Sequence, residues 1–223
     1  MSQFNRMDIR IGGVRAGRIV TGLSVAVFQL VTYQLLLQYN ADRLGSGPLW
    51  NIETAFDRAL PLIPEFAFVY FLYIPGLIIP ALLDMPMTLF LRYAVAMVLA
   101  VCVSSAGFAW IPLQVIHEPF VCTRLSCEGL VLLREVDPGV NLMPSLHASQ
   151  TLLAAMVLYF ASSRYQVRSF WWQWSACLYV PIIISTLVTK QHYVLDLLAG
   201  FGVAIAAWWL SGRLFHPVAR HAD

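Results

Sequence analysis

The apolar residues of this chain fall into long blocks without charged side chains, and polar and charged residues gather between the blocks. A helix that crosses a bilayer needs about 20 mostly apolar residues, so the pattern predicts six transmembrane helices. The charge-free blocks are 19–39, 66–83, 93–116, 148–163, 169–189 and 197–212. The fourth and sixth blocks are short, and we expect both helices to begin a little earlier. Pro75, Pro80 and Pro181 fall inside blocks and should kink their helices.

The composition of the 223 residues agrees with a membrane protein. Hydrophobic residues make up 59% and charged residues 12%, whereas a soluble domain carries about 25% charge. These values exclude a disordered chain and a soluble globular enzyme. A net charge of +2 is too small for binding a phosphate backbone, so we expect no nucleic-acid partner. The predicted fold class is an all-α integral membrane bundle of six helices.

Lysine and arginine are unevenly divided between the two predicted sides of the membrane. One side carries nine of them and the other five, so the positive-inside rule predicts that both termini are cytoplasmic. The chain then divides into a basic N-terminus at 1–18, a membrane domain at 19–215 and a tail at 216–223. The N-terminal segment lacks a small-residue cleavage site, and we interpret it as an uncleaved signal anchor.

Two polar motifs open the fourth and sixth predicted helices. The first is Pro-Ser-Leu-His at 144–147, and the second is Lys-Gln-His-Tyr-Val-Leu-Asp at 190–196. Both helices run inward from the outer side, so His147 and His192 begin at the same depth and can face each other. Asp196 follows His192 by four residues and shares its helix face. A carboxylate there can accept the imidazole N–H bond and fix the tautomer of the ring.

Three interpretations of this constellation stay open on residue types and spacing alone. In the first, His192 is a nucleophile oriented by Asp196, and His147 is a general acid. In the second, His147, His192 and Asp196 bind a metal ion. In the third, the same side chains form a polar network that holds helices together.

The connections between the predicted helices hold further polar residues. A connection as long as 112–143 is expected to be functional or disordered, and its acidic and histidine residues read as solvated loop. These residues are His117, Glu118, Glu128, Glu135 and Asp137. Cys122 and Cys127 lie close enough in sequence for a local disulfide in an oxidising compartment. The 40–64 linker has an apolar helical face, which suits either the membrane interface or surface packing.

At the two motifs the sequence resembles the type-2 phosphatidic acid phosphatase superfamily. That superfamily carries Pro-Ser-Gly-His, here with Leu146 in place of Gly, and a Ser-Arg pair followed by spaced His and Asp. Ser185, His192 and Asp196 fit the second motif, with Thr186 in place of Arg. The superfamily's Lys and Arg-Pro motif is absent. These departures resemble the branch of inositol-phosphorylceramide synthases and, more distantly, sphingomyelin synthases, and the specific similarity covers about residues 140–200.

The resemblance implies a metal-independent mechanism without a cofactor, through a phosphohistidine. His192 would attack phosphorus, Asp196 would orient it, and His147 would protonate the leaving alkoxide. The partners implied are a phospholipid or lipid-phosphate substrate and, as acceptor, a lipid hydroxyl such as ceramide or diacylglycerol. The enzymatic alternative is hydrolysis of phosphatidate or a polyprenyl diphosphate. The non-enzymatic alternative is a transporter or scaffold with the His/Asp set as a polar core.

A transferring phosphoryl group needs cations or N–H donors around its oxygens, and the usual cations of the superfamily are missing here. We expect Lys190, Arg124 and Arg134 to contribute charge, and Ser145 at the helix start and Tyr193 beside His192 to contribute polar contacts. Fewer cations suit a phosphodiester, which favours headgroup transfer over hydrolysis of a monoester. Small size and short loops favour a bacterial inner membrane, with the site facing the periplasm.

Overall fold

The structure is a computed structural model. It describes the backbone of residues 2–43, 50–111, 113–117, 119–120, 124–165 and 170–215, and their side chains except 2–13, 126, 165 and 170–176. The regular secondary structure of the described residues is helical apart from one isolated bridge between Trp50 and Leu113, which confirms the all-α prediction for this part. The helices are α1 (Ser2–Arg43), α2 (Ala55–Ala59), α3 (Phe66–Phe71), α4 (Tyr73–Leu82), α5 (Met87–Trp110), α6 (Leu125–Val136), α7 (Leu146–Tyr165), α8 (Phe170–Val188) and α9 (Val194–Leu214).

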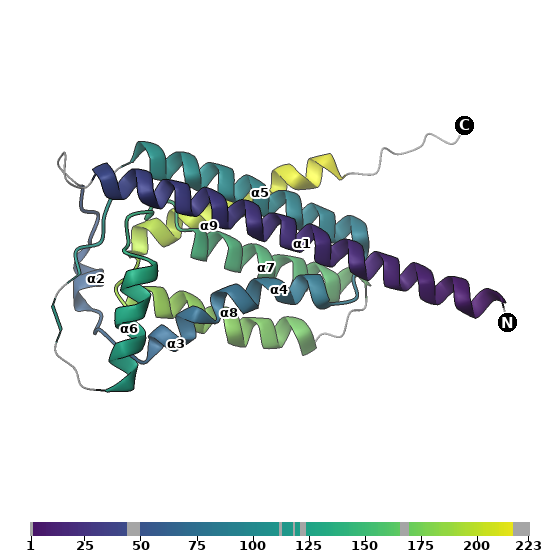
Figure 1. The fold of residues 1–223 in the computed structure, drawn as a ribbon, viewed down its shortest axis with the longest axis horizontal. Coiled ribbons are helices and arrows are strands. Elements are labelled where there is room, and N and C mark those ends of the chain that lie inside the picture. Colours follow the sequence, from purple (N-terminus) through teal and green to yellow (C-terminus); the bar gives the residue numbers. More distant parts are fainter. Residues whose placement is uncertain are drawn as a thin grey trace.

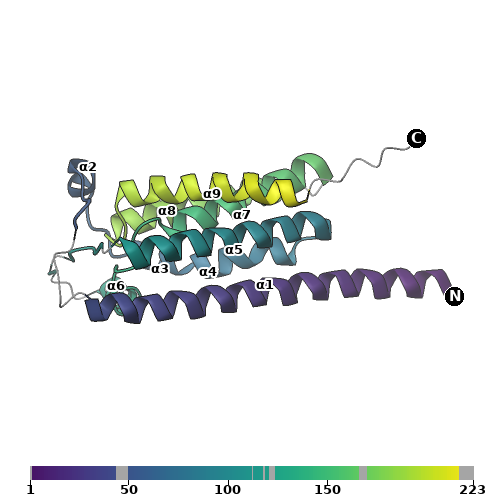
Figure 2. The same cartoon turned by 90° about the horizontal axis from the view of Figure 1, so that it is seen from above.

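The long helices run side by side as one bundle (Figures 1 and 2). α7 occupies the interior, where it contacts α4, α5, α8 and α9, and α1 lies along α4 and α5. The start of α1 and the end of α9 lie at the same end of the bundle (Figure 1). The opposite end carries α2 and α6, and α6 runs across the direction of the long helices (Figure 1).

The surface of the bundle has the character of a membrane protein. Among the described residues, three helices are long and apolar enough to cross a bilayer: Val14–Arg43 of α1, α5 and α9. Large apolar side chains on their outer faces are exposed, as with Leu23 and Leu35 at 61% and 63%. Lipid can cover apolar patches that water would not tolerate on this scale. The shorter apolar helices are Phe66–Leu82 and Cys177–Val188.

α1 is held to the bundle by a stripe of polar side chains on an otherwise apolar helix. The Arg18 guanidinium is buried and donates to the carbonyl of Met85 at 2.6 Å. Further along the same face, Gln29 accepts from Gln150 at 2.9 Å. The stripe continues with Tyr33, which donates to Asp137, and with Asn40, which donates to the Phe108 carbonyl and to Asn141.

The boundaries of the second and third predicted helices differ from the sequence pattern. The second is interrupted at Leu72, so that Pro75 falls in the first turn of α4, where its missing N–H is not needed. The third, α5, begins at Met87 and ends at Trp110 rather than Ile116. It includes Arg92 because the guanidinium donates to the Trp208 carbonyl and stacks on that ring at 4.0 Å.

The outer connections contain helices that the hydrophobic blocks did not predict. The long 112–143 connection includes α6, whose buried face is formed by Leu130 and Leu133 packed against Ala67 and Tyr70. The 40–64 linker includes α2, which is capped by Thr54 and Asp57, while Phe56 is exposed. Residues 2–18 of the predicted N-terminal segment belong to α1, and the predicted tail at 216–223 lies outside the described residues.

Candidate active site

The two polar motifs are brought together by a close approach between the starts of α7 and α9. The backbone N–H of Ser145 donates to the carbonyl of Asp196 at 3.1 Å. A Cβ at Gly200 would come within 2.9 Å of the Ala148 Cβ and closer still to the Ser145 carbonyl oxygen, so only glycine permits this approach. The Ser145 hydroxyl accepts from the Ala148 N–H at 3.3 Å and is buried. Ser145 is thus seen as a helix cap, and its substrate contact stays a prediction.

The predicted histidines and aspartate form a continuous hydrogen-bonded row. His147 Nδ1 lies 3.0 Å from His192 Nε2, and His192 Nδ1 lies 2.9 Å from Asp196 Oδ1. The row is buried: His147 is 8% exposed, His192 5% and Asp196 0%. The other Asp196 oxygen, Oδ2, accepts the Tyr193 N–H at 2.8 Å. Both carboxylate oxygens are therefore in use, and the aspartate is fixed in position.

This geometry determines which nitrogen carries each proton. Because Asp196 is an acceptor, His192 Nδ1 carries the hydrogen and Nε2 keeps its lone pair. When His192 is neutral, His147 Nδ1 then donates to that lone pair. The Nε2 lone pair of neutral His192 consequently points at the imidazole of His147. Alone, burial would lower the pKa of His192, but the carboxylate and hydrogen bond of Asp196 together with the charge of Asp137 raise it above the ordinary value.

Asp137 is a member of this site, so the prediction that it is a solvated loop residue is wrong. Its side chain is buried and accepts the hydroxyls of Tyr70 at 2.6 Å and Tyr33 at 2.7 Å. Burial alone would raise the pKa of the Asp137 carboxyl, but charge on the two histidines and these two hydroxyl bonds lower it. The carboxyl is therefore an anion facing the histidine pair.

Sequence reasoning missed Asp137 because its partners come from distant helices. Tyr33 belongs to α1 and Tyr70 to α3, and neither has a fixed spacing to a residue that directly follows α6. The only available signal was the presence of tyrosines inside apolar blocks, because a buried tyrosine hydroxyl needs a partner. The rings of Tyr70 and Tyr73 also lie against the His147 ring, with centroids 4.6 and 4.2 Å away.

Lys190 anchors the turn that carries His192. Its ammonium donates to the backbone carbonyls of Asp57 and Leu60, the latter at 2.7 Å. The Asp57 carboxylate in turn accepts the Val194 N–H at 2.8 Å, at the start of α9. The turn is closed from the other side by the Thr186 carbonyl, which accepts the N–H groups of residues 191 and 192. Lys190 thus has a positioning role here, and its predicted contact with phosphate stays a prediction.

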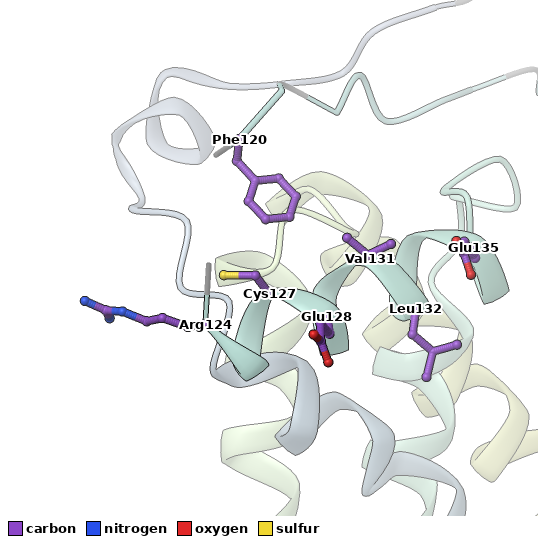
Figure 3. A pocket seen from close by; sticks show the side chains of 7 residues that line it. All are labelled: Phe120, Arg124, Cys127, Glu128, Val131, Leu132 and Glu135. Carbon is purple, nitrogen blue, oxygen red and sulfur yellow. The ribbon is translucent and has the colours of Figure 1, made fainter. Parts of the chain in front are cut away.

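Arg124, Arg134 and Tyr193 are the remaining predicted binding residues. Arg124 is largely exposed, pairs with Glu65 at 3.7 Å and borders a hollow on the outer side of α6. Figure 3 shows its side chain extending away from the other residues that line this hollow. The Arg134 guanidinium stacks on Phe120 at 4.8 Å. Tyr193 is buried in an apolar cluster with Leu113, Val115 and Leu142.

The cysteines divide between the outer loop and the bundle. Cys127 is disulfide-bonded, and Cys122, the partner expected from the sequence, lies outside the described residues. Cys102 and Cys177 carry free thiols on the outer faces of α5 and α8.

Comparison of the chain with protein-family models, with curated proteins and with solved structures finds no match.

Proposed function

We propose that this protein is a membrane-embedded lipid phosphatase or phosphotransferase that acts through a phosphohistidine on His192. The observation that carries the proposal is the buried row from His147 through His192 to Asp196, with contacts of 3.0 and 2.9 Å. A nucleophile, a proton donor and an orienting carboxylate stand in the order that covalent catalysis needs.

The proposed reaction has two steps that share one pair of imidazoles. His192 Nε2 attacks phosphorus, the bond to the leaving oxygen breaks, and the His147 imidazolium gives that oxygen a proton and becomes the neutral imidazole. Asp196 stabilises the positive charge that forms on the His192 ring. In the second step an acceptor hydroxyl loses its proton to His147 and attacks phosphorus, and the P–N bond breaks to restore His192. No metal or cofactor enters this scheme.

The charges around the pair favour a phosphodiester over a phosphomonoester. Asp137 is an anion beside the two histidines, and the only lysine ammonium in the chain is already bound to backbone carbonyls. A dianionic monoester is repelled more strongly by a carboxylate than a monoanionic diester is. We therefore propose transfer of a phospho-headgroup from a phospholipid to a lipid hydroxyl, such as that of ceramide or diacylglycerol.

The proposed topology places this chemistry at a lipid headgroup layer. We propose six spans formed by α1, α3 with α4, α5, α7, α8 and α9, with both termini cytoplasmic. The position of the start of α1 and the end of α9 at one end of the bundle supports an even number of spans (Figure 1). The histidine pair lies at the opposite end, which we assign to the periplasmic face of a bacterial inner membrane.

The test offers the purified protein a panel of phospholipids and lipid phosphates, with and without ceramide or diacylglycerol. Free phosphate, free headgroup and new phospholipid are measured together. We expect headgroup transfer from diesters by the wild type, and none by a folded His192→Ala variant. The matched control is His117→Ala, which removes another half-buried imidazole that lies outside the row.

Three outcomes would contradict the proposal. Full activity of His192→Ala would show that His192 is not the nucleophile. Release of phosphate from monoesters, with no reaction of diesters, would show that the enzyme hydrolyses lipid phosphates and does not transfer headgroups. A His192→Ala protein that fails to fold, together with a wild type inactive on every lipid, would favour the scaffold.

A further inference from the structure

The histidine pair and Asp137 together have the composition of a metal site. Each of the residues Asp137, His147 and His192 offers one ligand atom, and these atoms lie within 4.8 Å of one another. The two nitrogens are 3.0 Å apart. In a tetrahedral zinc site with bonds of about 2.0–2.1 Å, two ligand nitrogens are separated by roughly 3.3 Å. The imidazoles would need to separate by a few tenths of an ångström. The carboxylate oxygen, within 4.8 Å of both nitrogens, would need to approach them by up to about 1.5 Å.

The surroundings of these residues resemble the supporting shell of a metal centre. A ligating histidine commonly gives its second ring N–H to a carboxylate, and a ligating carboxylate is itself hydrogen-bonded. His192 gives its Nδ1 hydrogen to Asp196 at 2.9 Å. Asp137 receives the hydroxyls of Tyr70 and Tyr33 at 2.6 and 2.7 Å. Two of the three ligands are therefore already oriented by hydrogen bonds.

We propose that Asp137, His147 and His192 bind one Zn²⁺ ion through two imidazole nitrogens and one carboxylate oxygen, with a fourth position open. This donor set is typical of zinc sites that keep an open position. It differs from the set that the sequence suggested, because Asp196 hydrogen-bonds His192 Nδ1, on the far side of the ring from the ligand atom Nε2.

The ion takes the same lone pair that the proposed reaction uses. In the zinc-bound protein His192 Nε2 is a ligand and is unable to attack phosphorus. Zinc binding and phosphohistidine formation are therefore mutually exclusive. Binding itself is independent of the proposed function, whereas inhibition by zinc rests on it.

The experiment uses the full-length protein in detergent, without a histidine tag and freed of metal by a chelator. Zn²⁺ is titrated in competition with a chromophoric chelator, and Co²⁺ serves as a spectroscopic substitute. We expect one saturable Zn²⁺ per chain and the intense visible absorption of four-coordinate Co²⁺.

Three variants assign the ligands. Asp137→Asn should weaken zinc binding at least tenfold. Asp196→Asn removes the orienting partner and should weaken binding by about 10- to 100-fold. Glu135→Gln is the matched control, because its exposed carboxylate lies two residues away on α6, and its affinity should equal that of the wild type. If Asp137→Asn does not fold, the stoichiometry and cobalt spectrum of the wild type decide the question.

The outcomes separate this inference from the proposed function. No saturable Zn²⁺ on the wild type, or unchanged affinity in a folded Asp137→Asn, would overturn the zinc site and leave the lipid chemistry standing. A zinc-binding protein without transferase or phosphatase activity would sustain the site and overturn the proposed function. Activity that requires zinc would contradict the inference that zinc binding and phosphohistidine formation exclude each other.

Discussion

Replacing Asp196 by asparagine provides the sharpest test of how the active histidine is set up. Asp196 Oδ2 accepts the Tyr193 N–H at 2.8 Å and Oδ1 faces His192 Nδ1 at 2.9 Å. In Asp196→Asn the backbone N–H still demands an acceptor, so the amide oxygen must turn toward Tyr193. The amide NH₂ then faces His192 Nδ1 and donates to it. The ring hydrogen is forced onto Nε2, and the nucleophilic lone pair is lost.

The size of this effect follows from the change of tautomer in the His192 ring. A wrong tautomer of a catalytic histidine costs about 10⁴-fold in kcat with the geometry preserved, and we expect a loss of that order with little change in KM. The assay is headgroup transfer at saturating lipid, normalised to folded protein.

The acid side of the pH profile gives a second readout. The proposed reaction needs neutral His192, so we expect activity to fall as the pH drops through the pKa of His192. Asp196 and Asp137 raise the pKa of His192 above 6.5, and removing the charge of Asp196 should move the acid limb of any residual activity to lower pH.

The matched control is Asp57→Asn. Asp57 is also a buried carboxylate at the start of α9, where it accepts the Val194 N–H at 2.8 Å, but its hydrogen bonds do not involve His192. Its replacement should lower thermal stability, and kcat should fall far less than the roughly 10⁴-fold expected for Asp196→Asn, because the tautomer of His192 is kept. A folded Asp196→Asn variant within tenfold of wild-type kcat would refute the assignment of the tautomer to Asp196.

The remaining predictions concern stability and the role of the turn. Gly200→Ala places a Cβ against the Ser145 carbonyl and should lower the free energy of unfolding by about 1–3 kcal/mol. Gly202→Ala, whose Cβ would have nothing within 4 Å, should be neutral or stabilising by up to about 1 kcal/mol. Equal unfolding temperatures of the two variants would contradict this packing. Lys190→Met removes two hydrogen bonds to backbone carbonyls and should lower the unfolding temperature at constant KM, while a raised KM with unchanged stability would assign the ammonium to phosphate. The raised pKa of His192 stabilises the fold fully below the pKa of unfolded histidine, and this contribution is lost as pH rises through the folded-state value. The difference in unfolding temperature between wild type and His192→Gln should therefore shrink between pH of about 5 and about 9, and a constant difference would contradict it.

The sequence was sufficient to predict the long apolar helices and the contacts within the row of His147, His192 and Asp196. Apolar blocks identify helices because a bilayer leaves the backbone no partner except itself. The four-residue spacing from His192 to Asp196 predicted their contact, which the structure has at 2.9 Å. The pairing of His147 with His192 followed from the assumed direction of two helices, and the 3.0 Å contact agrees with it.

The parts that could not be predicted depend on contacts between distant segments. Asp137 becomes a site residue through tyrosines of α1 and α3, and the orientation of a connection gives no periodic signal. Lys190 lies two residues before His192 in the sequence, but the carbonyls that accept its hydrogen bonds belong to Asp57 in α2 and to Leu60 directly after α2. Helix ends also depend on such partners: Arg92 fits inside α5 only because Trp208 receives its guanidinium.

The polar stripe of α1 determines how the first helix aligns with the rest. The apolar side chains of α1 pack equally well at many positions along the bundle, so they alone would permit many alignments of this helix. Arg18, Gln29, Tyr33 and Asn40 each require one particular partner on another helix or connection. A slip of one turn, about 5.4 Å, would strand all four at once in surroundings without water. The first helix therefore joins the later ones in a single register, and that register delivers the Tyr33 hydroxyl to Asp137.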